Sequence, residues 1–129
     1  MKNDEERARL NATTRAVLGC AFGVSNTLGC GFLEKVYENA LAIDLLGAGH
    51  TVVQQAHVEV LYKEQVVGVY CPDLVVDGSV ILEIKAIDNL DPCHQLQCMN
   101  YLRATRLSVA LLLNFGRPRI QYKRIVWDF

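Results

Sequence analysis

The chain has 129 residues, of which 51% are hydrophobic and 21% are charged, and its formal net charge is −1. This composition excludes a disordered chain and predicts a single globular domain over residues 1–129. No apolar run is long enough to cross a bilayer, the start MKNDEERAR does not resemble a signal peptide, and five cysteines lack a C-x-x-C pair, so we expect a cytoplasmic protein without a membrane partner.

The first part of the chain predicts two helices. Residues 4–26 carry apolar side chains at near-helical spacing, and three acidic residues precede them at the positive end of the helix dipole. Gly29-Cys30-Gly31 breaks the chain, and Phe32–Leu46 is the second helix, followed by glycines that end it. Glu34 lies at the edge of its apolar stripe. Its carboxylate is either solvated or reaches inward to a site on the sheet.

Three strand-like stretches follow and predict an antiparallel meander. They span 51–62, 66–76 and 80–87, with a polar turn between the first two. Pro72 has no amide hydrogen to donate, so we expect strand pairing to weaken or bulge beside Asp73.

Three charged residues lie at the end of the hairpin remote from the turn signal Asp77-Gly78: Asp73, Glu83 and Lys85. Because strand side chains alternate, Glu83 and Lys85 share one face. Charges on an otherwise apolar hairpin are costly unless something compensates them. The compensation is either an ion pair that involves Lys85 or a divalent metal held by the carboxylates.

The length of the turn decides whether Asp73 can join Glu83. A two-residue loop would place the two carboxylates on opposite faces of the hairpin. A three-residue loop, spanning either Val76–Gly78 or Asp77–Ser79, would place both on one face. A metal site therefore requires an odd loop or a bulge.

The last third of the chain predicts a helix and two more strands. The helix begins with Asp91 as its cap and Pro92 as its first residue, and runs to about residue 104. The apolar run 107–114 predicts a central strand, and 119–127 an edge strand. The fold class is α/β, in the order α-α-β-β-β-α-β-β, with a central mixed sheet flanked by helices.

Several polar residues of this last third are candidates for a binding role. Gln97 and Tyr101 are four residues apart and share a helix face. Cys93, His94 and Cys98 lack a second ligand pair at finger spacing, so zinc is not expected. Four basic residues have two possible roles: they either protect the exposed edge strand from pairing with another chain, or bind the phosphates of a nucleic acid. They are Arg117, Arg119, Lys123 and Arg124.

Two motifs resemble known nucleases. Pro72-Asp73 followed by Glu83-Ile84-Lys85 resembles the signature of the PD-(D/E)XK nuclease superfamily, and Gly31–Tyr37 fits G-x-x-E-x-x-Y, the mark of its GxxExxY branch. The resemblance covers roughly residues 5–127. It implies a restriction-endonuclease-like core and implies that Glu34 joins Asp73 and Glu83 at a metal ion.

The chemistry that this pattern favours is metal-dependent hydrolysis of DNA or RNA. Mg²⁺ (or Mn²⁺) takes hard oxygen ligands, which Asp73, Glu83 and the Ile84 carbonyl supply. Lys85 orients or deprotonates the attacking water, or stabilises developing charge, and Gln97 holds Lys85 or that water. Tyr101 and the four basic residues are expected to contact nucleic acid.

The sequence leaves two alternatives open. One is a non-catalytic module that keeps the nuclease fold and binds nucleic acid or a protein. The other is a structural homo-oligomer in which the charges are only ion-paired.

Overall fold

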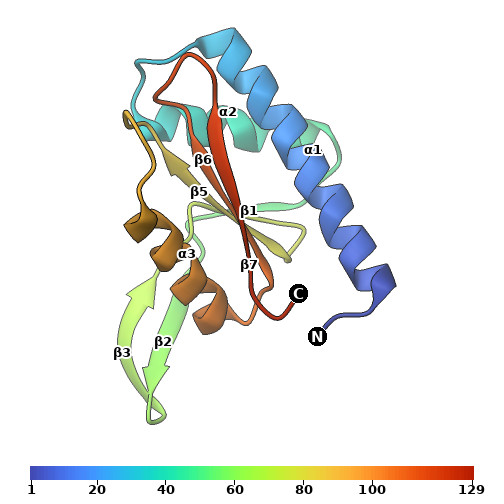
Figure 1. Ribbon diagram of the computed structural model, residues 1–129, viewed down its shortest axis with the longest axis vertical. Helices are drawn as coiled ribbons and strands as arrows, with labels where there is room; N and C mark the ends of the chain where they lie inside the picture. The colour runs from blue at the N-terminus through green and yellow to red at the C-terminus, as the bar shows by residue number, and fades with distance from the viewer.

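A computed structural model describes residues 1–129 and shows helices on both faces of a twisted sheet (Figure 1). The helices are α1 (Asp4–Leu28), α2 (Glu34–Gly47) and α3 (Pro92–Thr105). The strands are β1 (Val52–Gln54), β2 (Val58–Tyr62), β3 (Gln65–Tyr70), β4 (Leu74–Val76), β5 (Val80–Lys85), β6 (Val109–Asn114) and β7 (Gln121–Val126). None of the three helices has the length and hydropathy that crossing a bilayer requires.

The main sheet has five strands in the order β1-β4-β5-β6-β7. Strands β5 and β6 are parallel and α3 connects them, whereas the other neighbours in the sheet are antiparallel. The predicted mixed sheet between helices is therefore confirmed. So are the buried central strand β6 and the edge strand β7.

The first two predicted strands are each divided in two, although the sequence indicated a weak point only in the second of them, beside Asp73. Val52 pairs with Val76 and Val58 pairs with Tyr70, so one antiparallel register continues across the break. The break falls at Pro72, which has no N–H for the ladder, and opposite the adjacent Asp73 the residue Gln55 has a positive φ of 55°. The expected weakening beside Asp73 is confirmed. As a result the β2–β3 hairpin leaves the main sheet and extends past α3 (Figure 1).

The two faces of the sheet carry different helices. Val80, Leu82 and Ile84 pack with residues of α1 and α2 in the larger core, whereas Ile81 packs with Cys98 and Leu102 of α3. Side chains alternate along a strand. Glu83 and Lys85 therefore lie on the same face as Ile81, under α3.

The chain that leaves the site-bearing strand is clamped by the fully buried Asn114. Its Oδ1 accepts hydrogen bonds from the Ile87 and Gly116 amides, both at 3.0 Å, and its Nδ2 donates to the Ile87 carbonyl at 2.9 Å. The Phe115 amide also donates to the Lys85 carbonyl at 2.8 Å. The ends of β5 and β6 are thus fixed together just beyond Lys85.

Gly116 is the position where this clamp tolerates no side chain. A Cβ there would lie 2.3 Å from the Ile87 carbonyl oxygen, whereas a Cβ at Gly19, within α1, would have no neighbour within 4 Å. We expect Gly116→Ala to lower the free energy of unfolding by about 2–3 kcal/mol, because backbone must move. Gly19→Ala should raise it by up to about 1 kcal/mol through helix propensity. Urea unfolding of both variants checks this, and an unchanged midpoint for Gly116→Ala would contradict the close approach.

Candidate active site

The turn between β4 and β5 spans three residues, Asp77–Ser79, because Val76 pairs with Val80. The Ser79 amide donates to the Val76 carbonyl at 3.0 Å, and Asp77 and Gly78 both have positive φ angles, of 54° and 63°. The Asp77 carboxylate is held in turn by His50 Nδ1 at 2.8 Å and by the Thr51 amide at 3.0 Å. Of the two three-residue loops that the sequence allowed, this one places Asp73 directly opposite Glu83.

Asp73 and Glu83 consequently lie on one face, as predicted. Asp73 is half-buried, and its Oδ2 accepts a hydrogen bond from the Ile84 amide at 2.8 Å. Glu83 is only 9% exposed, and its Oε1 accepts a hydrogen bond from the Tyr70 hydroxyl. Burial raises the pKa of Glu83 to about 7; the Tyr70 hydrogen bond and Lys85 oppose this shift, and the Asp73 carboxylate adds to it.

Lys85 is half-buried at the end of β5 and forms no ion pair: no carboxylate oxygen lies within 4.0 Å of its Nζ. The ion-pair alternative required Lys85 to contact Asp73 or Glu83, and that expectation is wrong. Glu83 therefore accepts a hydrogen bond from the neutral Tyr70 hydroxyl and has no ion-pair partner in the chain.

The segment Gly31–Tyr37, which carries the G-x-x-E-x-x-Y motif, mainly stabilises the fold through Tyr37. Tyr37 is fully buried; its hydroxyl donates to the Gly29 carbonyl at 2.6 Å and accepts from the Phe32 amide, and its ring stacks on Phe115 with centroids 4.8 Å apart. The tyrosine thus fixes the loop that enters α2. Glu34 is exposed in the first turn of α2 and forms no hydrogen bond, which agrees with the solvated alternative, and its expected place at a metal ion stays a prediction.

Glu38, one turn after Glu34 on the same helix face, is the acidic residue of α2 that is buried, at 3% exposure. It accepts hydrogen bonds from Gln54 at 2.8 Å, from Gln55 at 3.2 Å and from Lys35 at 3.0 Å. The Gln55 amide also lies 3.4 Å from an oxygen of Asp73. Glu38 is therefore linked to the site through a single side chain.

The position of Glu38 in the sequence carries a signal for its burial. It lies between Tyr37 and Leu41, inside the stripe of side chains that α2 buries. A carboxylate in that position is expected to have a dedicated set of donors or a bound cation, because burial of an unpaired charge is costly. The G-x-x-E-x-x-Y motif instead directs attention to Glu34, one turn earlier.

Helix α3 brings one of its two candidates to the site. Tyr101 is half-buried, and burial together with the charge of Glu83 raises its pKa. Its ring stacks on Tyr70 with centroids 3.4 Å apart and an interplanar angle of 13°. Gln97 is exposed and forms no hydrogen bond to Lys85, and its expected role at the attacking water stays a prediction.

A group of ligand-type side chains at the start of α3 is explained by helix capping. Asp91, Cys93 and His94 have their ligand atoms within 4.8 Å of one another. The Cys93 amide donates to Asp91 Oδ1 at 2.8 Å, and the Asp91 amide donates to His94 Nδ1 at 3.1 Å. These are the two reciprocal bonds of a capping box, which satisfy the free amides of the first turn.

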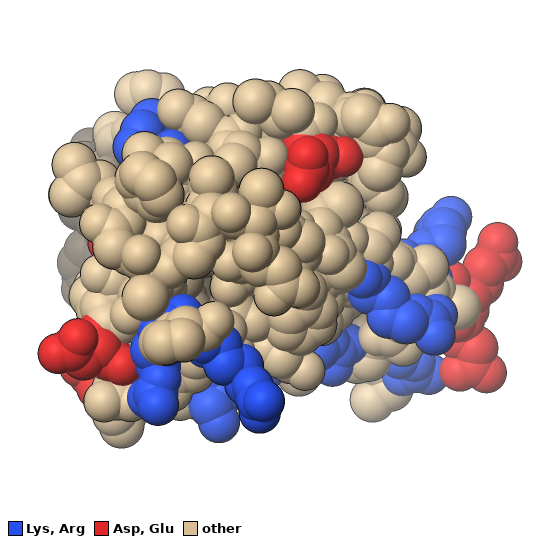
Figure 2. All heavy atoms as spheres, turned by 90° about the horizontal axis from the view of Figure 1, so that it is seen from above, with Lys and Arg blue, Asp and Glu red and all other residues tan.

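The four basic residues do not form one surface. Lys123 pairs with Leu112 and Arg124 with Leu111, so their side chains leave β7 on opposite faces. Arg124 donates to Asn11 of α1 at 2.9 Å, and Arg117 donates to Asn89. Figure 2 shows the end of the molecule with the α1–α2 and β6–β7 loops, where lysine and arginine side chains form separate groups rather than a continuous band. Arg119 is exposed.

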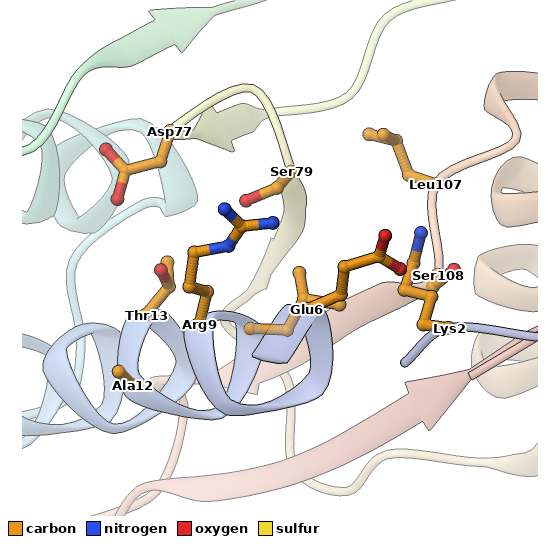
Figure 3. A pocket seen from close by; sticks show the side chains of 10 residues that line it. Lys2, Glu6, Arg9, Ala12, Thr13, Asp77, Ser79, Leu107 and Ser108 are labelled. Atoms are coloured by element: carbon orange, nitrogen blue, oxygen red, sulfur yellow. The ribbon is translucent and has the colours of Figure 1, made fainter. Parts of the chain in front are cut away.

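A cavity of about 720 Å³ lies away from these residues. It is lined by Asp77, Ser79 and Ser108, where β5 and β6 begin, whereas Lys85 is where β5 ends. Figure 3 shows Arg9 reaching from α1 toward the turn with Ser79, and Glu6 close to Lys2 and Ser108. Charges of both signs line the cavity, and it is separate from the carboxylate site.

The mixed sheet between helices, with an aspartate, a glutamate and a lysine on one hairpin, fits the restriction-endonuclease-like class of nucleases. A family model described as the PD-(D/E)XK nuclease superfamily matches residues 11–125, and the chain belongs to that superfamily. Members of this superfamily generally use divalent metal ions.

Two solved structures resemble this one. The crystal structure of SSO0001 aligns with a TM-score of 0.55 and 20% identity, over 74% of this chain and 50% of that one, and supports the fold. An alkaline exonuclease, LHK-Exo from Laribacter hongkongensis, aligns with a TM-score of 0.44 and 13% identity, over 73% of this chain and 56% of that one. The chain thus spans about half the length of the solved proteins that it matches. A comparison with curated proteins finds no match.

The raised pKa of Glu83 predicts how stability depends on pH. The pKa is about 7 in the folded protein against 4.5 for the free side chain, so the folded state holds the proton more tightly. The contribution of Glu83 to the free energy of unfolding therefore falls as the pH rises from about 4.5 to about 7, by at most about 3 kcal/mol.

Glu83→Gln should remove this fall and leave the variant more stable than the wild type at pH 8. Urea unfolding at pH 5, 6, 7 and 8 measures the difference between the two proteins. Glu59→Gln, at an exposed glutamate of β2, is the matched control and should follow the wild type. A wild type that gains stability relative to Glu83→Gln between pH 5 and 7 would show that the Tyr70 hydrogen bond outweighs burial.

Proposed function

We propose that the protein is a divalent-metal-dependent phosphodiesterase that hydrolyses DNA or RNA, of the GxxExxY type. One observation carries the proposal: the three-residue turn places Asp73 opposite Glu83, with an unpaired lysine two residues further along the same strand. Lys85 is then free for substrate or water, because its ammonium group forms an ion pair with neither carboxylate.

The residues of the site fit a hard cation such as Mg²⁺ or Mn²⁺. Asp73, Glu83 and the Ile84 carbonyl supply oxygen ligands, the donor type that these ions prefer. Glu83 is buried with no cationic partner, and a metal ion would compensate its charge better than a hydroxyl does. A ligand from α2 completes the set. Glu34 is the one that the family resemblance implies, and Glu38 is the one that the hydrogen-bond chain through Gln55 favours.

The side chains around the metal ligands have separate roles. The ion, when bound, lowers the pKa of a water molecule and polarises a phosphoryl oxygen. The Lys85 ammonium orients the attacking water or stabilises the charge that develops on the phosphate. Gln97 is exposed and available to the substrate, and Tyr101 offers a ring for stacking with a base. Of the basic residues, Lys123 is on the sheet face that carries Glu83, whereas Arg117, Arg119 and Arg124 serve substrate strands further away.

A non-catalytic module is the second candidate, and the completeness of the hydrogen bonding favours it. Every buried polar side-chain atom has a partner, and the site carboxylates are satisfied by Tyr70, Gln55 and the Ile84 amide. The site is thus stable without a cation. Only measurements of cleavage and of metal binding separate the two candidates.

Cleavage is the direct test of the proposed activity. We expect the wild type to cut at least one of single- or double-stranded DNA or RNA when Mg²⁺ or Mn²⁺ is present, and not when EDTA is added. Glu83→Gln and Lys85→Met should each lower the rate by at least about a hundredfold, because both act on charge in the transition state. Glu59→Gln is the control and should keep full activity. Equal rates for Glu83→Gln and the wild type would assign the cleavage to a contaminant, and no cleavage in any condition would favour the binding module.

Metal binding should also stabilise the fold. A ligand that binds only the folded state at about a hundred times its Kd adds about 2.7 kcal/mol, which corresponds to a rise in Tm of roughly 5 to 15 degrees. Glu83→Gln should lose most of that rise, while its metal-free Tm stays at or above the wild-type value because a buried carboxylate is gone.

The same melting curves identify the ligand from α2. We expect Glu38→Gln to lose most of the Mn²⁺-dependent rise in Tm and Glu34→Gln to keep it. Both substitutions keep the shape of the side chain, so the two variants are matched. The reverse result would assign the ligand to Glu34 and would leave Glu38 as a structural residue held by Lys35 and Gln54.

A further inference from the structure

The β2–β3 hairpin is attached to the rest of the molecule by little apolar contact. Of its eleven strand residues, only Val58, Val60 and Tyr70 are half-buried, and the others are exposed. The main-sheet ladder stops before it, at the break between β1 and β2 on one side and between β3 and β4 on the other. A segment with few buried contacts opens at a low cost in free energy.

Tyr70, the last residue of β3, makes two side-chain contacts from the hairpin to the rest of the molecule. Its ring stacks on Tyr101 of α3, and its hydroxyl donates a hydrogen bond to Oε1 of Glu83. One side chain therefore joins the loosely attached hairpin to the helix and to a carboxylate of the proposed site.

The hydroxyl hydrogen atom of Tyr70 occupies a lone pair of Glu83 Oε1. Each carboxylate oxygen has a limited number of acceptor positions, and the one engaged by a hydroxyl donor cannot face a cation in the same direction. One oxygen of the neighbouring Asp73 is also occupied, because its Oδ2 accepts a hydrogen bond from the Ile84 amide. That donor belongs to the backbone of β5 and cannot move away. Tyr70 is thus the donor of the site that can leave without disturbing the main sheet.

We propose that Tyr70 is a gate on the metal site: the β2–β3 hairpin closes over Glu83 when no cation is bound and is released when a cation takes that oxygen. The inference rests on the proposed function, since it requires a metal that Glu83 binds. Release of Tyr70 also uncovers the ring face of Tyr101, which becomes available for stacking with a base of the substrate. The Tyr70–Glu83 hydrogen bond and cation binding compete for the same oxygen. Because such coupling is reciprocal, a stronger hydrogen bond means weaker metal binding.

The experiment compares the wild type with Tyr70→Phe, which keeps the ring and its stack but removes the hydroxyl. Tyr62→Phe, at an exposed tyrosine of the same hairpin, is the matched control. Mn²⁺ is titrated by calorimetry at pH 8.5, where Glu83 is mostly ionised, so that few protons are released on binding. The same titration of Glu83→Gln shows which part of the binding belongs to this site. Hydrogen exchange of the β2 and β3 amides is followed with and without Mn²⁺.

We expect Tyr70→Phe to bind Mn²⁺ about tenfold more tightly than the wild type, since a hydrogen bond to a charged group no longer competes. Its hairpin amides should exchange faster than those of the wild type in the absence of metal, and Mn²⁺ should accelerate exchange in the wild-type hairpin. Tyr62→Phe should match the wild type in both measurements.

The outcomes separate the gate from the function on which it rests. Equal Mn²⁺ affinity in the wild type and Tyr70→Phe, with hairpin exchange that Mn²⁺ leaves unchanged, would overturn the gate and leave the metal site intact. No Mn²⁺ binding in either protein would overturn the metal site itself, and the gate with it.

Discussion

The register of the β4–β5 hairpin is the constraint on which the candidate site depends. Strand side chains alternate between faces, so a turn one residue shorter would send Asp73 and Glu83 to opposite sides of the sheet. The turn Asp77–Ser79 is held at three residues by two positive φ angles and by the hydrogen bonds of His50 and Thr51 to Asp77. The turn is at the opposite end of the strands from the carboxylates. Its length nevertheless decides that Asp73 and Glu83 share a face.

The break in the long antiparallel ladder is the second organising feature. It occurs where Pro72 withdraws a donor and Gln55 adopts a left-handed conformation, and the same register resumes beyond it. Because the strands part there, side chains from otherwise separate layers meet: Glu38 from α2 reaches Asp73 through Gln55, and Tyr70 reaches Glu83 from the hairpin. An uninterrupted sheet would have closed this gap with backbone hydrogen bonds.

The electrostatics of the site follow from burial with neutral partners. Glu83 has a hydroxyl rather than a lysine beside its oxygen, although Lys85 is only two residues away on the same face. Burial then outweighs the hydrogen bond and raises the pKa of the carboxyl. A buried carboxylate, an unpaired lysine and a second carboxylate opposite thus lie together at one end of the hairpin, and this grouping is the basis of the proposed cation site.

The sequence by itself determined the types and order of the elements, the need for an odd turn, and the weak point at Pro72, because periodicity, turn chemistry and a missing amide are local properties of the chain. It also supported Asp73, Glu83 and Lys85 as a group, since strand alternation relates residues two apart without knowledge of the fold. Only the tertiary structure decided that Lys85 is unpaired, that Glu38 rather than Glu34 is buried, that Gln97 is exposed, and that Tyr70 bonds Glu83. Those outcomes depend on where α2 docks and on how far the β2–β3 hairpin leaves the sheet. Both are set by contacts between segments distant in the chain, which no local pattern encodes.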